Sequence, residues 1–429
     1  MWLKKLLKNQ LKKQLMKADG IRLVNINPHH HNRFQDIEEL GLYLHIPFCR
    51  QICPYCPYNK EIFRTPVAES YANAVICEID SYIQLVGDRR ITSFYIGGGT
   101  PTTMLHFGLE RILSHIYNTF NMQCGIHMES HPNDLTPANL DRIASLGVEH
   151  LSIGVEALQD HHLRNLHRPY TAAMVKSAVK RAVGRDFTCV NADFIFALPG
   201  QTYQEVEHAG QSLVELGIDQ VAAYPLFEFP YTKWSQISKT KQHRGFSVFA
   251  KRKMQRILEK IFQEAGYERT SVWAFTKNGI PKYCSVTVPL YLGLGASGGS
   301  YLKDVFYLNT FNVSEYIHAL EAGRLPIALS VELTETMQMA GWLYWRVYET
   351  RFKKSDFMVR FKRQIDGVYG KYFKLLSQIG YLRDDGEEVV LTSAGAYWLH
   401  YIQDLFSIDY ISKLWGTSKQ TPWPQSVLL

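Results

Sequence analysis

The stretch "YLHIPFCRQICPYCPY", residues 43–58, places three cysteines within eight residues. They are Cys49, Cys53 and Cys56. The apolar run before them is typical of a strand that ends in a loop. Thiolates gathered on one loop bind soft metals, so the spacing indicates an inorganic centre with three protein ligands.

Three kinds of site compete for these thiols. A disulfide would leave one cysteine over. A structural zinc ion requires four closed ligands, and although His45 lies close, no fourth ligand stands at zinc-ribbon spacing. A 4Fe-4S cluster is fully ligated by four cysteines, so three would leave one iron open to a substrate or cofactor.

The composition describes an ordinary globular protein. The chain has 429 residues, 46% hydrophobic and 20% charged, which predicts two or three domains. Seven cysteines, four of them scattered singly and none preceded by a recognisable secretory signal, predict a reducing, cytoplasmic location. No apolar run approaches the roughly 20 residues that a membrane-spanning helix needs.

The first 17 residues, "MWLKKLLKNQLKKQLMK", combine a leucine stripe at helical spacing with lysines. Peripheral contact with anionic lipid is one interpretation, and a helix or basic arm on the protein's own surface is the favoured one. The following histidines at 29–31 point in different directions on an extended chain, which favours a loop or a substrate contact over a metal site. No role is assigned to Cys284.

Six apolar runs alternate with helical stretches. This order predicts parallel βαβ units and therefore an α/β fold. The predicted strands cover residues 41–46, 91–96, 125–130, 150–155, 189–196 and 220–227.

Polar and glycine residues gather where these strands end. The glycine-rich segment 97–100 follows the second strand, Glu129 ends the third, Glu156 ends the fourth and Asp193 lies in the fifth. Chemistry collects at this edge in barrels of alternating strands and helices. Glycines let the backbone approach a ligand closely, although a tight turn and surface carboxylates would give the same pattern.

Together, the C-x3-C-x2-C loop and the glycine loop resemble the radical S-adenosylmethionine (SAM) superfamily. The surrounding residues resemble its branch of oxygen-independent coproporphyrinogen III oxidase and related heme chaperones and methyltransferases. The resemblance implies a partial (β/α)6 barrel and a 4Fe-4S cluster on Cys49, Cys53 and Cys56. SAM would chelate the fourth iron. One electron from the cluster would then cleave SAM and leave a 5'-deoxyadenosyl radical.

The resemblance also implies the cofactor contacts. In "LSIGVEALQDHHLRNLHRPYT" the family's usual glutamine is Glu156, whose ionised carboxylate only accepts hydrogen bonds. In the oxidase this segment and "NADFIFALPGQT" line a pocket for a second SAM, so the change predicts that this pocket is altered or lost. The implied SAM contacts are Tyr43, Tyr55, Gly98, Gly99, Thr100, Glu129, Glu156, Arg168, Asp193 and Gly299.

Three parts are predicted along the chain. Residues 1–40 form an N-terminal basic helix and extended arm, residues 41–305 the barrel with its substrate-cavity extension, and residues 306–429 the C-terminal domain. The pattern predicts helices, a hairpin at Asp385 and Gly386, and a last helix, an order that is winged-helix-like. Interspersed charges without a basic stripe argue against nucleic-acid binding. The segment "LTSAGAYWLHYIQ" resembles the branch's C-terminal domain, which caps the barrel mouth.

The expected function is that of a radical SAM oxidoreductase acting on a small molecule, a tetrapyrrole, by oxidative decarboxylation. It would work as a monomer with a flavodoxin- or ferredoxin-type reductant. Three departures keep other functions open, and the first is the change to Glu156 described above. Tyr58 replaces a further cysteine of the oxidases, and "PKYCSVTVPLYLGLG" lacks the His-Asn and Tyr-Trp signature of the heme chaperones. The alternatives are radical methylation or alkylation of another substrate and non-catalytic heme carriage.

Overall fold

The computed structural model describes residues 20–27, 31–240, 245–282 and 289–429. The predictions made for residues 1–17, for the side chains of the histidines at 29–31 and for Cys284 lie outside this description.

Six parallel strands form the centre of the molecule and lie side by side in chain order. All six coincide with the apolar runs of the sequence, so the predicted α/β fold is confirmed. Because neighbouring strands are parallel, their carboxyl ends meet at one edge of the sheet. The strands are β2 (Glu39–Ile46), β5 (Arg90–Gly98), β7 (Ile126–Ser130), β8 (Val148–Glu156), β9 (Cys189–Phe196) and β10 (Gln220–Pro225).

Helices connect these strands and bury apolar faces against the sheet. Helix α7 shows how the local sequence fixes such an element, because Thr202 and Glu205 form a reciprocal capping box at its start. The connecting helices are α2 (Thr65–Val86), α3 (Leu109–Thr119), α4 (Pro137–Ser145), the short α5 (Asp160–Asn165), α6 (Ala172–Val183) and α7 (Tyr203–Glu215).

The sheet continues beyond the six strands on both sides. Strand β13 (Tyr291–Leu294) pairs parallel with β2, and β14 (Gly299–Leu302), β15 (Val305–Asn309) and β16 (Ile327–Glu332) follow in antiparallel order. Next come β1 (Arg22–Val24) and β20 (Ser426–Leu428), while β12 (Ala274–Lys277) and β11 (Tyr267–Arg269) extend the opposite side. Within the described residues this path does not return on itself, so the barrel is open.

A second, smaller core lies in the C-terminal part. Strands β17 (Arg351–Lys353), β19 (Glu388–Leu391) and β18 (Leu382–Asp384) form a three-stranded antiparallel sheet. Helices α11 (Glu335–Tyr348), α12 (Lys354–Phe361) and α13 (Ile365–Gln378) belong to the same part, after α10 (Val313–Glu321). The predicted hairpin is present and Gly386 has a φ of 98°. The apolar residues of this core include Phe352, Phe357, Tyr369, Phe373 and Val389.

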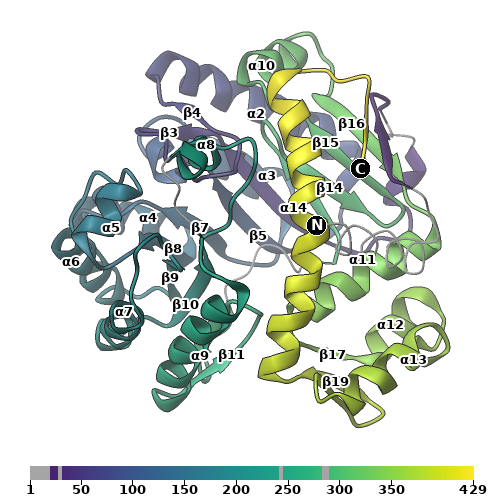
Figure 1. Cartoon of the computed structure of the whole chain (residues 1–429). Helices are drawn as coiled ribbons and strands as arrows, with labels where there is room; N and C mark the ends of the chain where they lie inside the picture. Colours follow the sequence, from purple (N-terminus) through teal and green to yellow (C-terminus); the bar gives the residue numbers. More distant parts are fainter. Residues whose placement is uncertain (1–19, 28–30, 241–244, 283–288) are drawn as a thin grey trace.

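The last helix, α14 (Ser393–Gln420), passes in front of the sheet from the end near β17 and β19 to the end near α10 (Figure 1). Near its start, the Tyr397 hydroxyl donates to the carbonyl of Val248 in α9 (Val248–Glu264) at 2.6 Å. Near its end, Lys419 donates to the carbonyl of Pro57 at 2.7 Å. Helix α14 therefore connects helix α9 to the cysteine loop.

The remaining short elements are β3 (Phe48–Cys49), β4 (Glu61–Ile62), β6 (Asn121–Met122) and α8 (Lys233–Thr240). Among the residues that the structure describes, no helix combines the length and the apolar character needed to cross a membrane.

Candidate functional site

The cysteine loop starts where β2 ends. Strands β3 and β4 pair in parallel and close the loop between them, with Cys49 as a member of β3. Cys49 is buried, Cys53 and Cys56 are partly exposed, and all three thiols are free of disulfides. The Thr100 hydroxyl lies 3.6 Å from the sulfur of Cys49, within hydrogen-bonding distance of a thiolate. The cysteine loop and the glycine loop therefore touch.

The donor set suits a cluster of several irons. Within the described residues the three sulfurs do not all lie within 4.8 Å of one another. His45 is no fourth ligand, because it is only 3% exposed and both of its ring nitrogens are engaged. Its Nδ1 lies 2.8 Å from the Tyr43 hydroxyl and its Nε2 lies 3.0 Å from the carbonyl of Asn59. Three thiolates that each bind a different iron fit this arrangement.

The glycine loop is fastened to the cysteine strand by its backbone. Gly99 N–H donates to the carbonyl of Ile46 at 2.7 Å, and Thr100 N–H donates to that of Phe48 at 2.8 Å. A Cβ atom at residue 99 would lie 2.7 Å from the Phe48 carbonyl oxygen, so the close approach that requires glycine is to the protein itself. Gly98 has a φ of 119°, and a Cβ there would collide with the ring of His45 at 2.5 Å. Both glycines serve to bring the two loops together.

Glu129, at the end of β7, lies directly against this glycine loop. Its Oε1 accepts a hydrogen bond from the Tyr95 hydroxyl at 2.7 Å, and its Oε2 accepts one from Gly98 N–H at 3.1 Å. Burial raises the pKa of its carboxyl. The ring of Tyr95 stacks on that of Tyr43 at 6.1 Å between centroids. The structure thus brings Tyr43, Gly98 and Glu129 together, and their contact with SAM stays a prediction.

Glu156 and Arg168 form a buried ion pair on the other side of the cysteine loop. Arg168 also donates to the hydroxyl of Tyr55 from Nε at 3.0 Å and from Nη2 at 2.5 Å. Tyr55 stands between two of the cysteines, so the pair reaches the loop through this ring. Glu156 has a φ of 63°, a left-handed conformation that is uncommon for residues other than glycine.

Asp193 completes a group of three carboxyls. It accepts hydrogen bonds from the Ser152 hydroxyl at 2.8 Å and from the side-chain amide of Asn191 at 3.1 Å. Burial, followed by the charges of Glu129 and Glu156, raises its pKa to about 7. The three carboxyls therefore share one electrostatic environment at the carboxyl edge of the sheet.

Gly299 lies in β14, where its backbone approaches Gly293, the residue of β13 that pairs with Tyr43. It pairs with Leu308 of β15, and a Cβ atom there would meet the side chains of Leu308 and Phe306 at 3.1 and 3.7 Å. The segment after β13 approaches the site through Gly295, where a Cβ atom would lie 2.5 Å from the carbonyl oxygen of His45. Gly295 N–H donates to the buried Glu78 at 2.8 Å.

Sequence reasoning missed several members of the site. Tyr95 stands two residues before Gly97 in the same strand, and Asn191 stands two residues before Asp193. Since alternate residues of a strand share a face, this period of two was the available signal. Lys419 had no such signal, because only the path of α14 brings it to the cysteine loop.

The sequence is similar to proteins of known families. Residues 43–213 match the family model of the radical SAM superfamily. The heme chaperone HemW of Bacillus subtilis (strain 168) is 26% identical over 360 residues, which cover 82% of this chain and 95% of that protein. The oxygen-independent coproporphyrinogen III oxidase of Paracoccus denitrificans (strain Pd 1222) is 24% identical over 310 residues, covering 66% of this chain and 67% of that one.

The fold has a solved counterpart. The coproporphyrinogen III oxidase HemN from Escherichia coli, described as a radical SAM enzyme, superposes with a TM-score of 0.78 at 20% identity, covering 90% of this chain and 94% of that one. These comparisons confirm the resemblance to the radical SAM superfamily, and within it to the coproporphyrinogen oxidases and heme chaperones.

Proposed function

Because residues 43–213 match the radical SAM model, we propose that this protein is an enzyme that cleaves SAM to a 5'-deoxyadenosyl radical. Cys49, Cys53 and Cys56 would hold a 4Fe-4S cluster through three of its irons. One observation carries the proposal. Three free thiols and three mutually interacting carboxyls lie at the same edge of a parallel sheet, joined by the contact between Thr100 and Cys49.

The charges of the site suit SAM, which carries a sulfonium and an ammonium group. Glu129, Glu156 and Asp193 are three acidic groups, and Arg168 is the cation paired among them. Buried carboxylates without a matching positive charge are costly, so a cationic ligand would stabilise this arrangement. Glu129, already oriented by Tyr95 and Gly98, is the acceptor best placed for an ammonium group.

When bound, the cluster would supply the electron that breaks a carbon–sulfur bond of SAM. The protein's share is to position the reactants and to exclude water. Helix α14 contributes here, because it passes in front of the sheet and is anchored at the cysteine loop by Lys419 (Figure 1).

For the substrate we propose a tetrapyrrole and, as the reaction, oxidative decarboxylation of its propionate groups. The support is the names of the relatives, which are coproporphyrinogen oxidases and heme chaperones. Arg168 is engaged by Glu156 and Tyr55, so it is not a free partner for a propionate carboxylate. Cytoplasmic location, a flavodoxin- or ferredoxin-type reductant and a monomeric state remain part of the same proposal.

Heme carriage is the second candidate, and one specific observation favours it. The heme chaperone of Bacillus subtilis aligns over 95% of its own length, whereas the oxidase of Paracoccus denitrificans aligns over 67%. Most of this chain, 82%, is therefore matched by nearly the whole of a protein named a heme chaperone.

Mass spectrometry and heme titration on one anaerobic preparation distinguish the two candidates. The reconstituted protein is incubated with reductant, SAM and coproporphyrinogen III, and the porphyrinogen is analysed for loss of carbon dioxide. A parallel sample is titrated with heme and followed by its absorbance. Decarboxylation supports the oxidase. Tight stoichiometric heme binding with an unchanged porphyrinogen supports the carrier. If neither decarboxylation nor heme binding is observed, tetrapyrroles are excluded as the ligand class.

A further inference from the structure

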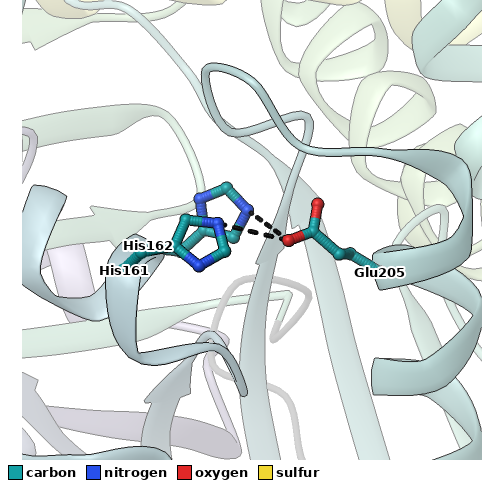
Figure 2. A group of neighbouring side chains, drawn as sticks. All are labelled: His161, His162 and Glu205. Carbon is teal, nitrogen blue, oxygen red and sulfur yellow. Dashed lines mark ion pairs between the residues drawn. The ribbon is translucent and has the colours of Figure 1, made fainter.

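Two adjacent histidines face one glutamate at a distance from the cysteine loop. His161 and His162 lie in the short helix α5, and Glu205 lies in the first turn of α7. Figure 2 shows both imidazole rings directed at the same carboxylate oxygen. The Nε2 atom of His161 lies 3.2 Å from Glu205 Oε1, and that of His162 lies 3.6 Å from it.

These separations match the ligand spacing around a zinc ion. Zinc binds histidine nitrogen at about 2.0–2.1 Å and carboxylate oxygen at about 2.0–2.2 Å in tetrahedral geometry. Two ligands at that distance and angle are roughly 3.3–3.5 Å apart. Two histidines and one glutamate also form a known zinc ligand set that leaves a fourth position open.

The glutamate is held in place by its neighbours. Its Oε2 accepts hydrogen bonds from the Thr202 backbone N–H at 2.8 Å and from the Thr202 hydroxyl at 3.0 Å. This capping box fixes the carboxylate and leaves Oε1 directed at the histidines. Such orientation of a ligand by outer hydrogen bonds is typical of protein metal sites.

His162 provides the second observation. Its side chain is only 1% exposed, and among the described residues neither ring nitrogen has a hydrogen-bond partner within 3.5 Å, since its Nε2 meets Glu205 Oε1 only at 3.6 Å. A buried polar group without a hydrogen bond costs about 1–3 kcal/mol. A metal ion would satisfy the buried nitrogen.

We propose that His161, His162 and Glu205 bind one divalent transition-metal ion, with Zn²⁺ as the best match. The fourth position would face solvent beside His161, whose side chain is 53% exposed. This site is separate from the cysteine loop and does not depend on the radical chemistry proposed above.

The ion would have a structural effect on the neighbouring segment. Helix α5 follows the strand that ends in Glu156, and the carbonyl of Leu163 in α5 accepts the backbone N–H of Arg168 at 2.9 Å. Joining α5 to α7 through a metal would therefore steady the segment that carries both members of the Glu156–Arg168 pair.

Calorimetric titration of the full-length, cluster-loaded protein with Zn²⁺ tests the proposal. We expect one equivalent to bind, and at least tenfold weaker binding in His161→Ala and in Glu205→Gln. Both variants retain the packing, because His161 is exposed and the glutamine side chain of the second variant can still accept the capping hydrogen bonds. His208→Ala, an exposed histidine on the same helix as Glu205, is the matched control and should bind as the wild type does.

X-ray absorption at the zinc edge of the same complex identifies the ligands. Nitrogen and oxygen neighbours at about 2.0–2.1 Å support the site, whereas sulfur at about 2.3 Å would place the zinc on the cysteine loop and overturn it. Equal zinc binding by the wild type, His161→Ala and Glu205→Gln, or no binding by any of them, would overturn it as well.

Discussion

Arg168 and Glu156 form an ion pair in which both side chains are only about a tenth exposed, at 12% and 11%. By its resemblance to the oxidases, this segment was expected to hold a glutamine at the position of Glu156. A carboxylate at that place neutralises the guanidinium, which would otherwise be available to a ligand carboxylate. The ion pair is therefore the structural reason to expect that a second SAM pocket is altered in this protein.

Glu156→Gln should restore a second SAM equivalent. The wild type is expected to bind one equivalent of SAM, because the carboxylate of Glu156 is paired with Arg168 and keeps it from a second SAM. The amide removes this charge, so the variant is expected to bind two. Equilibrium dialysis with labelled SAM measures both, and Glu149→Gln, exposed on the same strand, is the control. Two equivalents in the wild type would contradict the explanation.

Glu129→Gln should weaken SAM binding by at least about tenfold while iron content stays unchanged. The carboxylate accepts from Tyr95 and from Gly98 N–H, and an amide can accept only on its oxygen side and carries no charge for an ammonium group. The measurement is the dissociation constant of SAM together with iron per chain. An unchanged constant would show that Glu129 is not part of the SAM site.

Asp193→Asn should reduce the dependence of folding stability on pH. The pKa of Asp193 is raised to about 7, so the folded protein binds more protons than the unfolded chain between roughly pH 4 and 7. Its stabilising contribution is therefore complete below about pH 4 and is lost as the pH rises through 7. One such group changes the free energy of unfolding by up to about 1.4 kcal/mol per pH unit.

Urea unfolding of Asp193→Asn and of the wild type under argon, at pH 5, 6, 7 and 8, measures this effect. Any pH dependence that comes from cluster loss is common to both proteins, so the difference between them isolates the aspartate. The variant's free energy of unfolding should fall less steeply from pH 5 to 7. If the free energy of unfolding changed with pH equally in the two proteins, the raised pKa of Asp193 would be contradicted.

Lys419→Met should make the cluster easier to lose. Lys419 donates to the carbonyls of Pro57 and Tyr58 at 2.7 and 3.1 Å, which fastens α14 to the residues next to Cys56. We expect several-fold faster loss of the iron–sulfur absorbance in the presence of a chelator. Lys413→Met is the control, because that lysine lies on the same helix and pairs with the exposed Asp409. Equal rates of absorbance loss in the two variants would show that the contact of Lys419 with the cysteine loop does not protect the cluster.

Periodicity and spacing were sufficient for the six parallel strands and for the polar residues where they end, whereas the barrel came from the family resemblance. The six strands read clearly because each is an apolar run between helical stretches, and parallel pairing then places Glu129, Glu156 and Asp193 at one edge. Gly98 was predicted to let a ligand approach the backbone, which stays a prediction, and the structure adds that a side chain there would collide with His45. Local sequence does not say which neighbour a glycine approaches.

Long-range contacts account for what the sequence could not show. Lys419 reaches the cysteine loop across more than 300 residues of chain, and no local pattern links the two. The histidines of α5 are followed by Glu205 only after a further helix and strand, so their meeting depends on how those elements pack. Such relationships require the packed fold.

The central claim is that this protein cleaves SAM, and formation of 5'-deoxyadenosine tests it most directly. Dithionite-reduced, cluster-loaded protein is incubated with SAM under anaerobic conditions, and the products are separated by liquid chromatography, with Cys53→Ala as the control. We predict 5'-deoxyadenosine from the wild type, formed faster when coproporphyrinogen is present, and none from Cys53→Ala. Wild-type protein that retains its cluster and forms no 5'-deoxyadenosine under any of these conditions would contradict the account.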